Sequence, residues 1–502
     1  MKICIVGPSQ SGKTTLANII NRITGLKMIS GDDYIKEHST DWAGLETALA
    51  SDDEYVLEHI SATRLMAKFS QTPSLVLFLG IQKASPDLKT KYFQEQESLR
   101  QQNLKYFAGD SITDLLPAFL DHFFENRGLP PPITNFVIEV SSRCNLNCSY
   151  CYMYAGGYDT SWRQQPPFMS PEIASATARQ IVRHARLYPN QKFVTVFHGG
   201  EPLLMKVGDF KEIAERFKSE FASMSNIVLS VQTNGTRITD EYLSALDDLG
   251  FGVGVSLDGD KTDNNRRLTL AGDASFEASL SGLRKCLAFP FSKGQRVGVL
   301  SVINPASDGS AVYRFFRQLG VRAVDFLLCD HNSDTPLQPE VIEGNTRFLI
   351  SAFDAWLKDP EICSVAFFRS AIAGICNFPQ SVDTLSLLLP STLCVSTSGG
   401  WELLGVLRVT EPGAWTTPFN VFEHSVENVI ASQQYKGTLR STYDLSDRCL
   451  GCRHLLTCGG GHITHRFKTK NGFKNPSVHC ETLLLFLDHV KSRLVDELEM
   501  SR

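Results

Sequence analysis

The stretch "SSRCNLNCSYCYMY" places Cys144, Cys148 and Cys151 within eight residues of one another. Three thiols this close together seldom serve packing alone, because thiolates bind soft metals such as zinc and iron. A closed zinc site needs a fourth ligand, and the only close candidates for one are asparagine and serine. An iron–sulfur cluster that is bound by three cysteines keeps one iron open to an outside ligand. The triplet therefore favours an open iron–sulfur cluster, with a zinc knuckle as the alternative.

A second group of cysteines lies near the C-terminus. The segment "CLGCRHLLTC" contains Cys449, Cys452 and Cys458, and Cys480 follows further along the chain. Four thiolates at such spacing can close a metal site completely. An auxiliary iron–sulfur cluster, a rubredoxin-like iron and a structural zinc all fit the spacing. Most of the other six of the 13 cysteines are scattered and are expected to be small buried apolar residues.

The N-terminus carries a glycine-rich motif, "GPSQSGKTT", which follows the expected strand "KICIVG". It matches the pattern G-x4-G-K-[ST], in which backbone amides and a lysine surround phosphates and a hydroxyl binds Mg²⁺. The motif predicts an ATP and Mg²⁺ site. Its residues are Gly7, Gly12, Lys13, Thr14 and Thr15.

Two acidic residues follow in "MISGDDYIKEH", Asp32 and Asp33. The segment resembles the acidic turn of uridine kinases and nicotinamide riboside kinases, which implies that a carboxylate faces the acceptor hydroxyl. Such a carboxylate can accept the hydroxyl proton during phosphoryl transfer. We name both residues as candidate catalytic residues. An active kinase, a nucleotide-gated binding module and a degenerate remnant all remain open.

The elements that must position these residues follow from the hydrophobic pattern. Strand-like runs such as "NFVIEV", "KFVTVFHGG" and "NIVLSVQTNG" alternate with amphipathic stretches. This rhythm predicts an α/β fold with parallel sheets and helices outside them. The cysteine triplet follows the first strand of this series, at the carboxyl end where such folds place their chemistry.

The seam "ENRGLPPPIT" interrupts both hydrophobic periods and marks a linker. We expect a P-loop domain with a parallel sheet over residues 1–125, a linker over 126–133 and a βα-repeat core over 134–335. A helical bridge over 336–393 and a cysteine-rich domain with a C-terminal helix over 394–502 complete the expected organisation.

Composition excludes several classes of protein. The 502 residues carry a formal net charge of −5, which gives no general attraction to nucleic acid or to an anionic membrane. No uninterrupted apolar run reaches the ~20 residues of a membrane helix, and the N-terminus does not resemble a secretion signal. We expect a cytoplasmic protein with neither nucleic acid nor membrane as a partner.

The triplet, followed by Tyr152, resembles the motif of the radical S-adenosylmethionine (SAM) family. The resemblance implies a partial (β/α)6 TIM-like barrel and a 4Fe–4S cluster whose open iron binds SAM. Cleavage of SAM then yields a 5′-deoxyadenosyl radical that abstracts hydrogen from the substrate. Similarity to the family's later strand ends implies cofactor contacts from Gly199, Gly200, Glu201, Gln232, Asn234, Ser256, Asp258 and Arg266.

The second cysteine group resembles the SPASM extension of peptide-modifying radical enzymes, in which the four positions hold an auxiliary 4Fe–4S cluster. The family's second auxiliary cluster uses a CGGGC run, but here the run reads "CGGGH" with His462. Upstream, "CVSTSGGWELL" offers only Cys394. We therefore expect one auxiliary cluster. His462 and His465 are candidate ligands or proton carriers, or ordinary loop histidines.

The segment "CGGGHITHRF" resembles the FxsB-like branch of these enzymes, which acts on ribosomally made peptides. The leading hypothesis is thus a peptide maturase that forms a cyclophane or another cross-link, fused to a kinase-like domain and supplied with electrons by a flavodoxin or ferredoxin. An alternative is an enzyme that phosphorylates a small metabolite and then transforms it by radical chemistry. A non-enzymatic redox or nucleotide sensor is the third hypothesis.

Overall fold

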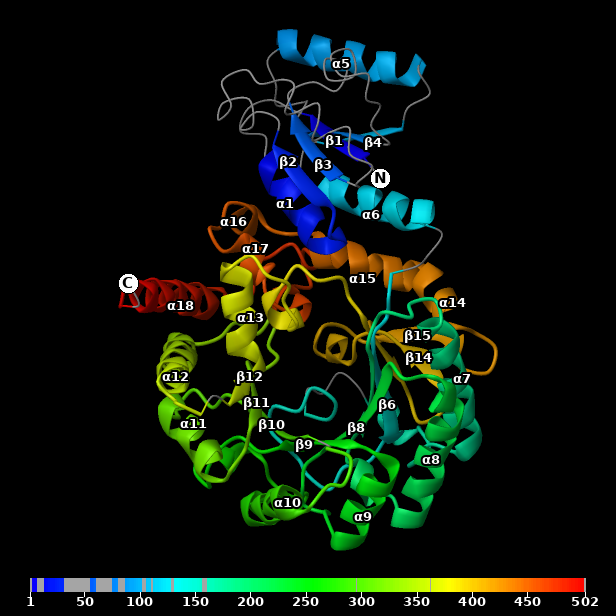
Figure 1. Cartoon of the computed structure of the whole chain (residues 1–502), viewed down its shortest axis with the longest axis vertical. Coiled ribbons are helices and arrows are strands. Elements are labelled where there is room, and N and C mark those ends of the chain that lie inside the picture. Colours follow the sequence, from blue (N-terminus) through cyan, green and yellow to red (C-terminus); the bar gives the residue numbers. More distant parts are fainter. Residues whose placement is uncertain are drawn as a thin grey trace. The chain divides into compact units, whose positions relative to one another are not determined.

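The computed structural model describes most of the chain. The described residues are 2–6, 13–30, 55–59, 75–79, 86–101, 105–109, 112–127, 131–155, 160–294, 296–361 and 363–500. The chain divides into two compact units, the first of residues 1–129 and 387–389 and the second of residues 130–386 and 390–502. Each unit is built around its own sheet (Figure 1).

The first unit contains a five-stranded sheet in the order β2-β3-β1-β4-β5, and all four strand pairs are parallel. Its strands are β1 (Lys2–Val6), β2 (Lys27–Ser30), β3 (Tyr55–His59), β4 (Leu75–Leu79) and β5 (Tyr106–Gly109). Its described helices are α1 (Lys13–Thr24), α5 (Pro86–Gln101) and α6 (Ile112–Arg127). Every residue of β4 is buried, as expected for a parallel strand that is covered on both faces.

The second unit begins with six strand–helix repeats, and each strand pairs in parallel with the next. The strands are β6 (Asn135–Ser141), β7 (Phe193–Gly199), β8 (Ile227–Thr233), β9 (Gly252–Ser256), β10 (Val297–Val302) and β11 (Ala323–Leu327). The helices are α7 (Pro171–Ala185), α8 (Val207–Glu220), α9 (Asp240–Leu249), α10 (Phe276–Ala288), α11 (Gly309–Gln318) and α12 (Pro339–Leu357). The helices lie outside the curved sheet (Figure 1), so all six carboxyl ends meet at one edge.

Local sequence explains these elements. Strand β7 alternates buried and half-buried residues, so that Phe193 and Phe197 pack among the aromatic side chains of the surrounding helices. Helix α7 starts where the Ser170 hydroxyl accepts a hydrogen bond from the Ile173 amide. Helix α9 ends at Gly250, whose φ of 79° lies in the left-handed region that glycine adopts without strain.

The remaining elements extend the sheet and carry the second cysteine group. Strand β12 follows β11, while β13 pairs with β6 on the opposite side and continues into an antiparallel extension. The elements are β12 (Ser364–Val365), α13 (Ala366–Ile375), β13 (Thr392–Val395), β14 (Gly400–Glu402), β15 (Thr416–Asn420), α14 (Val426–Ala431), α15 (Gln433–Tyr443), α16 (Asp447–Leu450), α17 (Leu455–Cys458) and α18 (Cys480–Met500).

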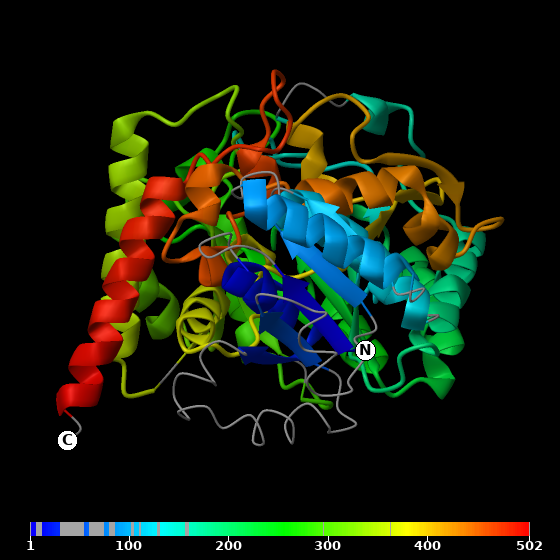
Figure 2. The same cartoon turned by 90° about the horizontal axis from the view of Figure 1, so that it is seen from above.

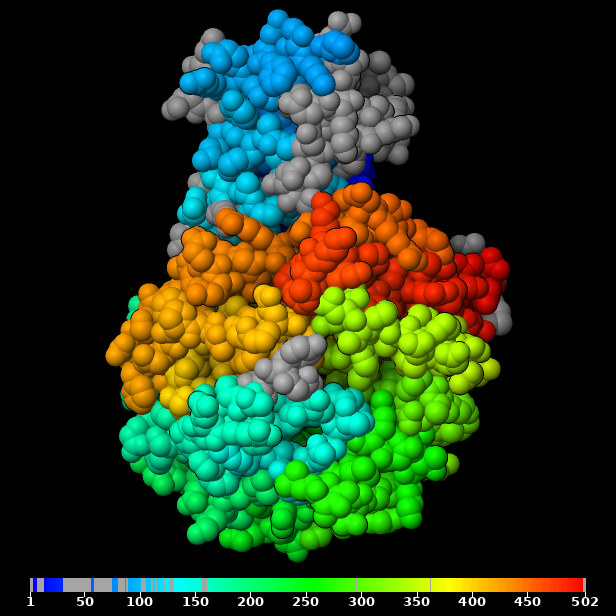
Figure 3. All heavy atoms as spheres, turned by 180° about the vertical axis from the view of Figure 1, so that it is seen from behind, coloured from blue at the N-terminus to red at the C-terminus, as the bar shows by residue number. Residues whose placement is uncertain are grey.

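Helix α18 packs against α12 and α13 (Figures 1 and 2). The contact contains aromatic rings that pack edge-to-face or tilted, among them Phe353, Phe368 and Phe486. Figure 3 shows the orange and red C-terminal segment on the surface beside the yellow-green helical segment. Among the described residues, no helix is long and apolar enough to cross a membrane.

Candidate functional site

A cavity of about 340 Å³ opens at the carboxyl edge of the second unit's sheet. Cys144, Cys148 and Cys151 line it from the loop after β6. Residues from the ends of β7, β8, β9, β10 and β11 complete the wall. The parallel sheet thus brings together side chains that lie far apart in the sequence.

Backbone contacts fix the cysteine loop in place. The Cys151 amide donates to the Cys148 carbonyl at 3.1 Å, and the Asn147 amide donates to the Leu268 carbonyl at 2.7 Å. Burial raises the pKa of the Cys144 thiol to about 12, and it also raises the pKa of Cys148 and Cys151. The three thiols are therefore neutral without metal, and a bound metal must displace their protons.

Gly199 and Gly200 bring the end of β7 against this loop. The Gly200 amide donates to the Ser141 carbonyl at 2.8 Å. A Cβ at Gly199 would lie 2.1 Å from the Ser141 carbonyl oxygen, and one at Gly200 would lie 2.1 Å from that of Arg143. Only glycine permits this approach, and both glycines line the cavity.

Glu201 is fully buried, and hydrogen bonds within the fold use its carboxylate. It accepts hydrogen bonds from the Thr233 hydroxyl at 2.6 Å, the Asn234 amide at 2.6 Å and the Leu203 amide at 2.9 Å. Burial raises its pKa in spite of these bonds. Its side chain does not line the cavity, so in this structure Glu201 orders the end of β8.

Gln232, Asn234 and Ser256 do line the cavity. The Gln232 side-chain amide donates to the Ser256 hydroxyl at 2.8 Å. Gly254 makes room for it, because a Cβ there would lie 2.2 Å from Gln232 Oε1. These polar groups at the ends of β8 and β9 offer hydrogen bonds to a ligand.

The arginine that faces the cavity is Arg267, which the sequence reasoning missed. It is buried and donates to the Tyr150 hydroxyl at 2.8 Å, and that hydroxyl donates to Asp258 at 2.6 Å. Arg266 instead donates to the Val302 and Ile303 carbonyls. Neither Arg266 nor Asp258 lines the cavity. The adjacent Arg266 and Arg267 are visible in the sequence, but the sequence does not say which of the two faces the cavity.

His198 is a second residue that the sequence reasoning missed. It lines the cavity from the end of β7, and its Nδ1 atom is buried without a hydrogen-bond partner among the described residues. Burial, together with the nearby charge of Arg408, lowers its pKa to about 4. A neutral imidazole is therefore available to accept a hydrogen bond from a ligand.

The second cysteine group lines a separate cavity of about 300 Å³. All four of its thiols contribute: Cys449, Cys452, Cys458 and Cys480. Cys449 lies in α16, Cys458 ends α17, Cys480 begins α18, and Cys452 lies in the connection between α16 and α17. Burial, together with the other three thiols, raises the pKa of Cys458 to about 12.

Sulfur spacing distinguishes a cluster from a zinc ion. A tetrahedral zinc with Zn–S bonds of ~2.3 Å holds its sulfur atoms ~3.8 Å apart. In the described part of the chain, one group of three potential ligand atoms lies within 4.8 Å, and it contains no cysteine. The donor sets themselves fit iron–sulfur clusters, because three thiolates leave one iron open and four thiolates complete the coordination.

Cys394 lines neither of the two cavities. It is buried beside Arg408, which donates to Glu139 at 3.1 Å and to Glu402 at 2.6 Å. Two carboxylates and a guanidinium therefore stand next to this thiol.

Four of the residues predicted to form the site of the first unit lie outside the described part of the chain. These are Gly7, Gly12, Asp32 and Asp33. Lys13 begins α1 and is buried, and Thr14 and Thr15 follow it in the first turn.

Comparison with known proteins adds an independent line of evidence. Residues 138–305 match the family model of the Radical SAM superfamily. The chain is 24% identical over 381 residues to a cysteine-type anaerobic sulfatase-maturating enzyme of Clostridium novyi (strain NT), covering 72% of this chain and 96% of that protein. It is 23% identical over 385 residues to a serine-type enzyme of Bacteroides thetaiotaomicron (strain ATCC 29148), covering 72% and 89%.

Solved structures give the same fold. Native anSMEcpe with bound AdoMet superposes with a TM-score of 0.63 at 20% identity, covering 73% of this chain and all of that chain. The form with AdoMet and the Cp18Cys peptide gives a TM-score of 0.62 over 74% of this chain. At this identity the likeness establishes the fold.

Proposed function

We propose that this chain, a radical SAM enzyme related to the anaerobic sulfatase-maturating enzymes, modifies a residue within a peptide. The main observation behind this proposal is that the three clustered thiols share one cavity with polar groups from neighbouring strand ends. A solved relative supports the choice of substrate, because the structure of anSMEcpe holds both AdoMet and the Cp18Cys peptide.

The cavity residues act on the cofactor's charged end. When bound, the open cluster and SAM supply an electron and a 5′-deoxyadenosyl radical. Arg267 presents a guanidinium that suits a carboxylate, and Gln232 and Ser256 offer hydrogen-bonding groups to a ribose or to the amino acid part. Tyr150 holds Arg267 in place through its hydroxyl.

The other side of the cavity suits an apolar substrate side chain. Leu300, Val302 and Leu327 line it from the ends of β10 and β11, together with Leu328 and Val406. Apolar walls around the radical exclude water and competing hydrogen donors. This surface favours an aromatic or aliphatic residue as the one that is modified. It supports the finer proposal of a cross-link in a ribosomally made peptide.

We propose a different role for the cavity that the second cysteine group lines. Its four thiols complete the coordination of one auxiliary cluster, so no iron is left open for substrate. We assign it to electron transfer after the substrate has lost its hydrogen. Cys394 does not line this cavity, which supports a count of one auxiliary cluster.

For the first unit we propose an ATP·Mg²⁺ site at the carboxyl end of β1. Strand β1 lies in the middle of a parallel sheet, and α1 starts at Lys13 after a short connection. The chain places β2 and β3 on one side of β1 and β4 on the other. Ligands of open α/β sheets bind at such switch points. Kinase activity belongs to this proposal, as does a nucleotide switch.

Two substitutions separate a kinase from a switch. Lys13→Ala removes a cation from the phosphates and should weaken ATP binding, measured by equilibrium dialysis. Asp33→Asn should leave ATP binding intact. If the unit is a kinase, Asp33→Asn abolishes phosphoryl transfer and leaves 5′-deoxyadenosine formation unchanged. If it is a switch, Lys13→Ala slows the radical step instead. Normal ATP binding by Lys13→Ala protein would show that the site is not a phosphate cradle.

The radical function is tested by product analysis under anaerobic conditions. A candidate peptide incubated with the enzyme, SAM and reduced flavodoxin should lose two hydrogens as 5′-deoxyadenosine accumulates. Cys376→Ala is the matched control for replacement of Cys144, Cys148 and Cys151, because Cys376 is exposed and belongs to neither cysteine group. A phosphorylated and rearranged small metabolite in place of a modified peptide would favour the two-step alternative.

A further inference from the structure

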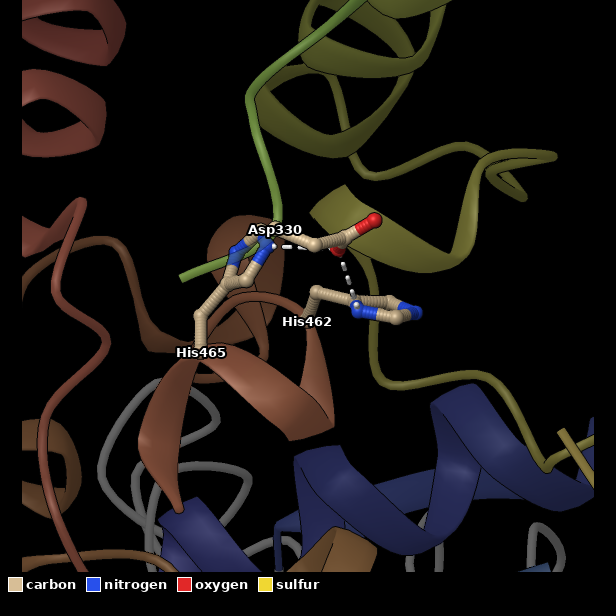
Figure 4. A group of neighbouring side chains, drawn as sticks. All are labelled: Asp330, His462 and His465. Atoms are coloured by element: carbon tan, nitrogen blue, oxygen red, sulfur yellow. Dashed lines mark hydrogen bonds and ion pairs between the residues drawn. The ribbon is translucent and has the colours of Figure 1, made fainter. Parts of the chain in front are cut away.

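Asp330, His462 and His465 form a compact group at the edge of the cysteine-triplet cavity. Asp330 follows β11 and lines that cavity. His462 and His465 belong to the cysteine-rich segment, at the short helix η8 (Ile463–Arg466). Figure 4 shows both imidazoles beside the Asp330 carboxylate.

The distances suit a single ion. Asp330 Oδ1 lies 3.1 Å from His465 Nε2 and 3.9 Å from His462 Nδ1. Tetrahedral ligands at ~2.0–2.1 Å from zinc are ~3.4 Å apart, and these two distances bracket that value. In the part of the chain that the structure describes, this is the one group of three such atoms within 4.8 Å.

The group is built into the fold. Both histidines are buried, and the His465 amide donates to the His462 carbonyl at 3.1 Å. Gly459, Gly460 and Gly461 all have positive φ values, so the chain turns sharply between Cys458 and His462. The backbone therefore fixes the positions of His462 and His465 before any ligand binds.

A neighbouring imidazole supports the arrangement. His479 Nε2 donates to the Cys329 carbonyl at 2.9 Å, next to Asp330, and its ring centroid lies 4.7 Å from that of His465. His479 therefore packs against the His465 ring and ties its segment to the backbone beside Asp330.

Hydrogen bonding explains only part of the geometry. His465 can donate to Asp330, but His462 Nδ1 is too far from it for a hydrogen bond and pairs with the Thr464 hydroxyl at 2.8 Å. Rotation of that hydroxyl frees the nitrogen. An ion between the three side chains would use both imidazoles and the carboxylate.

We propose that Asp330, His462 and His465 bind one divalent transition-metal ion of the zinc or iron(II) class. Imidazole and carboxylate ligands suit these ions. Three protein ligands leave a coordination position for water or for an oxygen of the substrate. The ion would act at the cavity edge as a Lewis acid. This inference does not depend on the peptide assignment.

Zinc binding by the full-length holoenzyme tests the proposal. Protein with filled clusters is equilibrated with Zn²⁺ and desalted, and zinc and iron are counted. We expect about one zinc per chain from the single three-residue site. Asp330→Asn and His462→Gln should each weaken zinc binding at least tenfold and leave iron unchanged. His489→Gln is the matched control, because His489 pairs with Asp354 at 2.9 Å elsewhere in the unit.

A second measurement needs no variant. Zinc K-edge absorption of the loaded wild type should show only nitrogen and oxygen neighbours at ~2.0–2.1 Å, whereas thiolate ligands would appear at ~2.3 Å. Sulfur neighbours, no retained zinc, or unchanged zinc affinity in Asp330→Asn and His462→Gln would each overturn the proposal.

Discussion

The side-chain amide of Asn234 donates to Asn145 Oδ1 at 2.9 Å and so ties the end of β8 to the loop of the cysteine triplet. Asn234 Oδ1 in turn accepts hydrogen bonds from the amide and hydroxyl of Thr236. The loop is therefore held from β8 as well as from β7. Residues such as Asn234, which are not metal ligands, therefore help to fix the positions of the three thiols.

Asn234→Ala should loosen the cysteine loop. One hydrogen bond between neutral groups contributes about 1 kcal/mol, so SAM affinity of the holoenzyme should fall about fivefold by equilibrium dialysis. Asn226→Ala is a matched control, because Asn226 makes a similar bond to the Gln191 carbonyl on an exposed part of the unit. The double change with Asn145→Ala should cost no more than the larger single change. Additive losses would show that the two residues act separately.

Arg267→Gln should be far more damaging than Arg266→Gln. The first change leaves Asp258 buried without its nearby cation, and breaking such a pair costs about 3–5 kcal/mol. The second removes hydrogen bonds to two carbonyls and stacking on Tyr150. We expect urea unfolding to show the larger loss for Arg267→Gln, and SAM binding to be lost with it. Equal SAM affinity in the two variants would contradict the assignment of Arg267 to the cavity.

Arg408→Met should destabilise the second unit by about 3–5 kcal/mol, because it leaves Glu139 and Glu402 buried and uncompensated. Arg453→Met removes an exposed pair with Asp488 and should cost at most about 1 kcal/mol. Denaturant midpoints of the two variants provide the comparison. Similar midpoints would mean that the surroundings of Glu139 and Glu402 rearrange without a loss of stability.

Asp325 makes stability depend on pH. Burial, together with the nearby charge of Asp383, raises its pKa to about 7 in the folded chain, whereas an unfolded aspartate titrates at ~3.9. Between these values the folded state holds a proton that the unfolded state has lost. This contribution is full below pH ~4 and falls as pH rises to about 7.

Asp325→Asn should remove this slope, which amounts to a few kcal/mol. Its amide oxygen can still accept the bond from the Phe367 amide. Urea unfolding of cluster-free protein at several pH values measures the slope, and Asp273→Asn, at an exposed carboxylate, is the control. A slope that persists in Asp325→Asn would assign it to another group.

The sequence predicted the elements and the ligand types better than the directions of side chains. The cysteine triplet was placed after the first strand of the repeat core, and that is where it lies. Arg266 and Arg267 are adjacent, and only the turn of the short helix Asp263–Arg266 decides which one faces the cavity. The contact of Glu201 with the cofactor stays a prediction, and in this structure its carboxylate accepts hydrogen bonds from Thr233, Asn234 and Leu203.

Other features could not be read from the sequence at all. Asp330 and His465 are 135 residues apart, and no local spacing connects them. Their meeting depends on how the cysteine-rich segment folds over the end of β11. Long-range side-chain convergence of this kind requires the tertiary structure.

Iron counting together with 5′-deoxyadenosine analysis tests the central claim most directly. Anaerobically reconstituted wild type should hold about eight irons per chain, from two 4Fe–4S clusters, and should cleave SAM when reduced. Replacement of Cys144, Cys148 and Cys151 with Ala should leave about half the iron and no 5′-deoxyadenosine. Full 5′-deoxyadenosine formation by that variant, or wild type with zinc in both cysteine groups, would contradict the account.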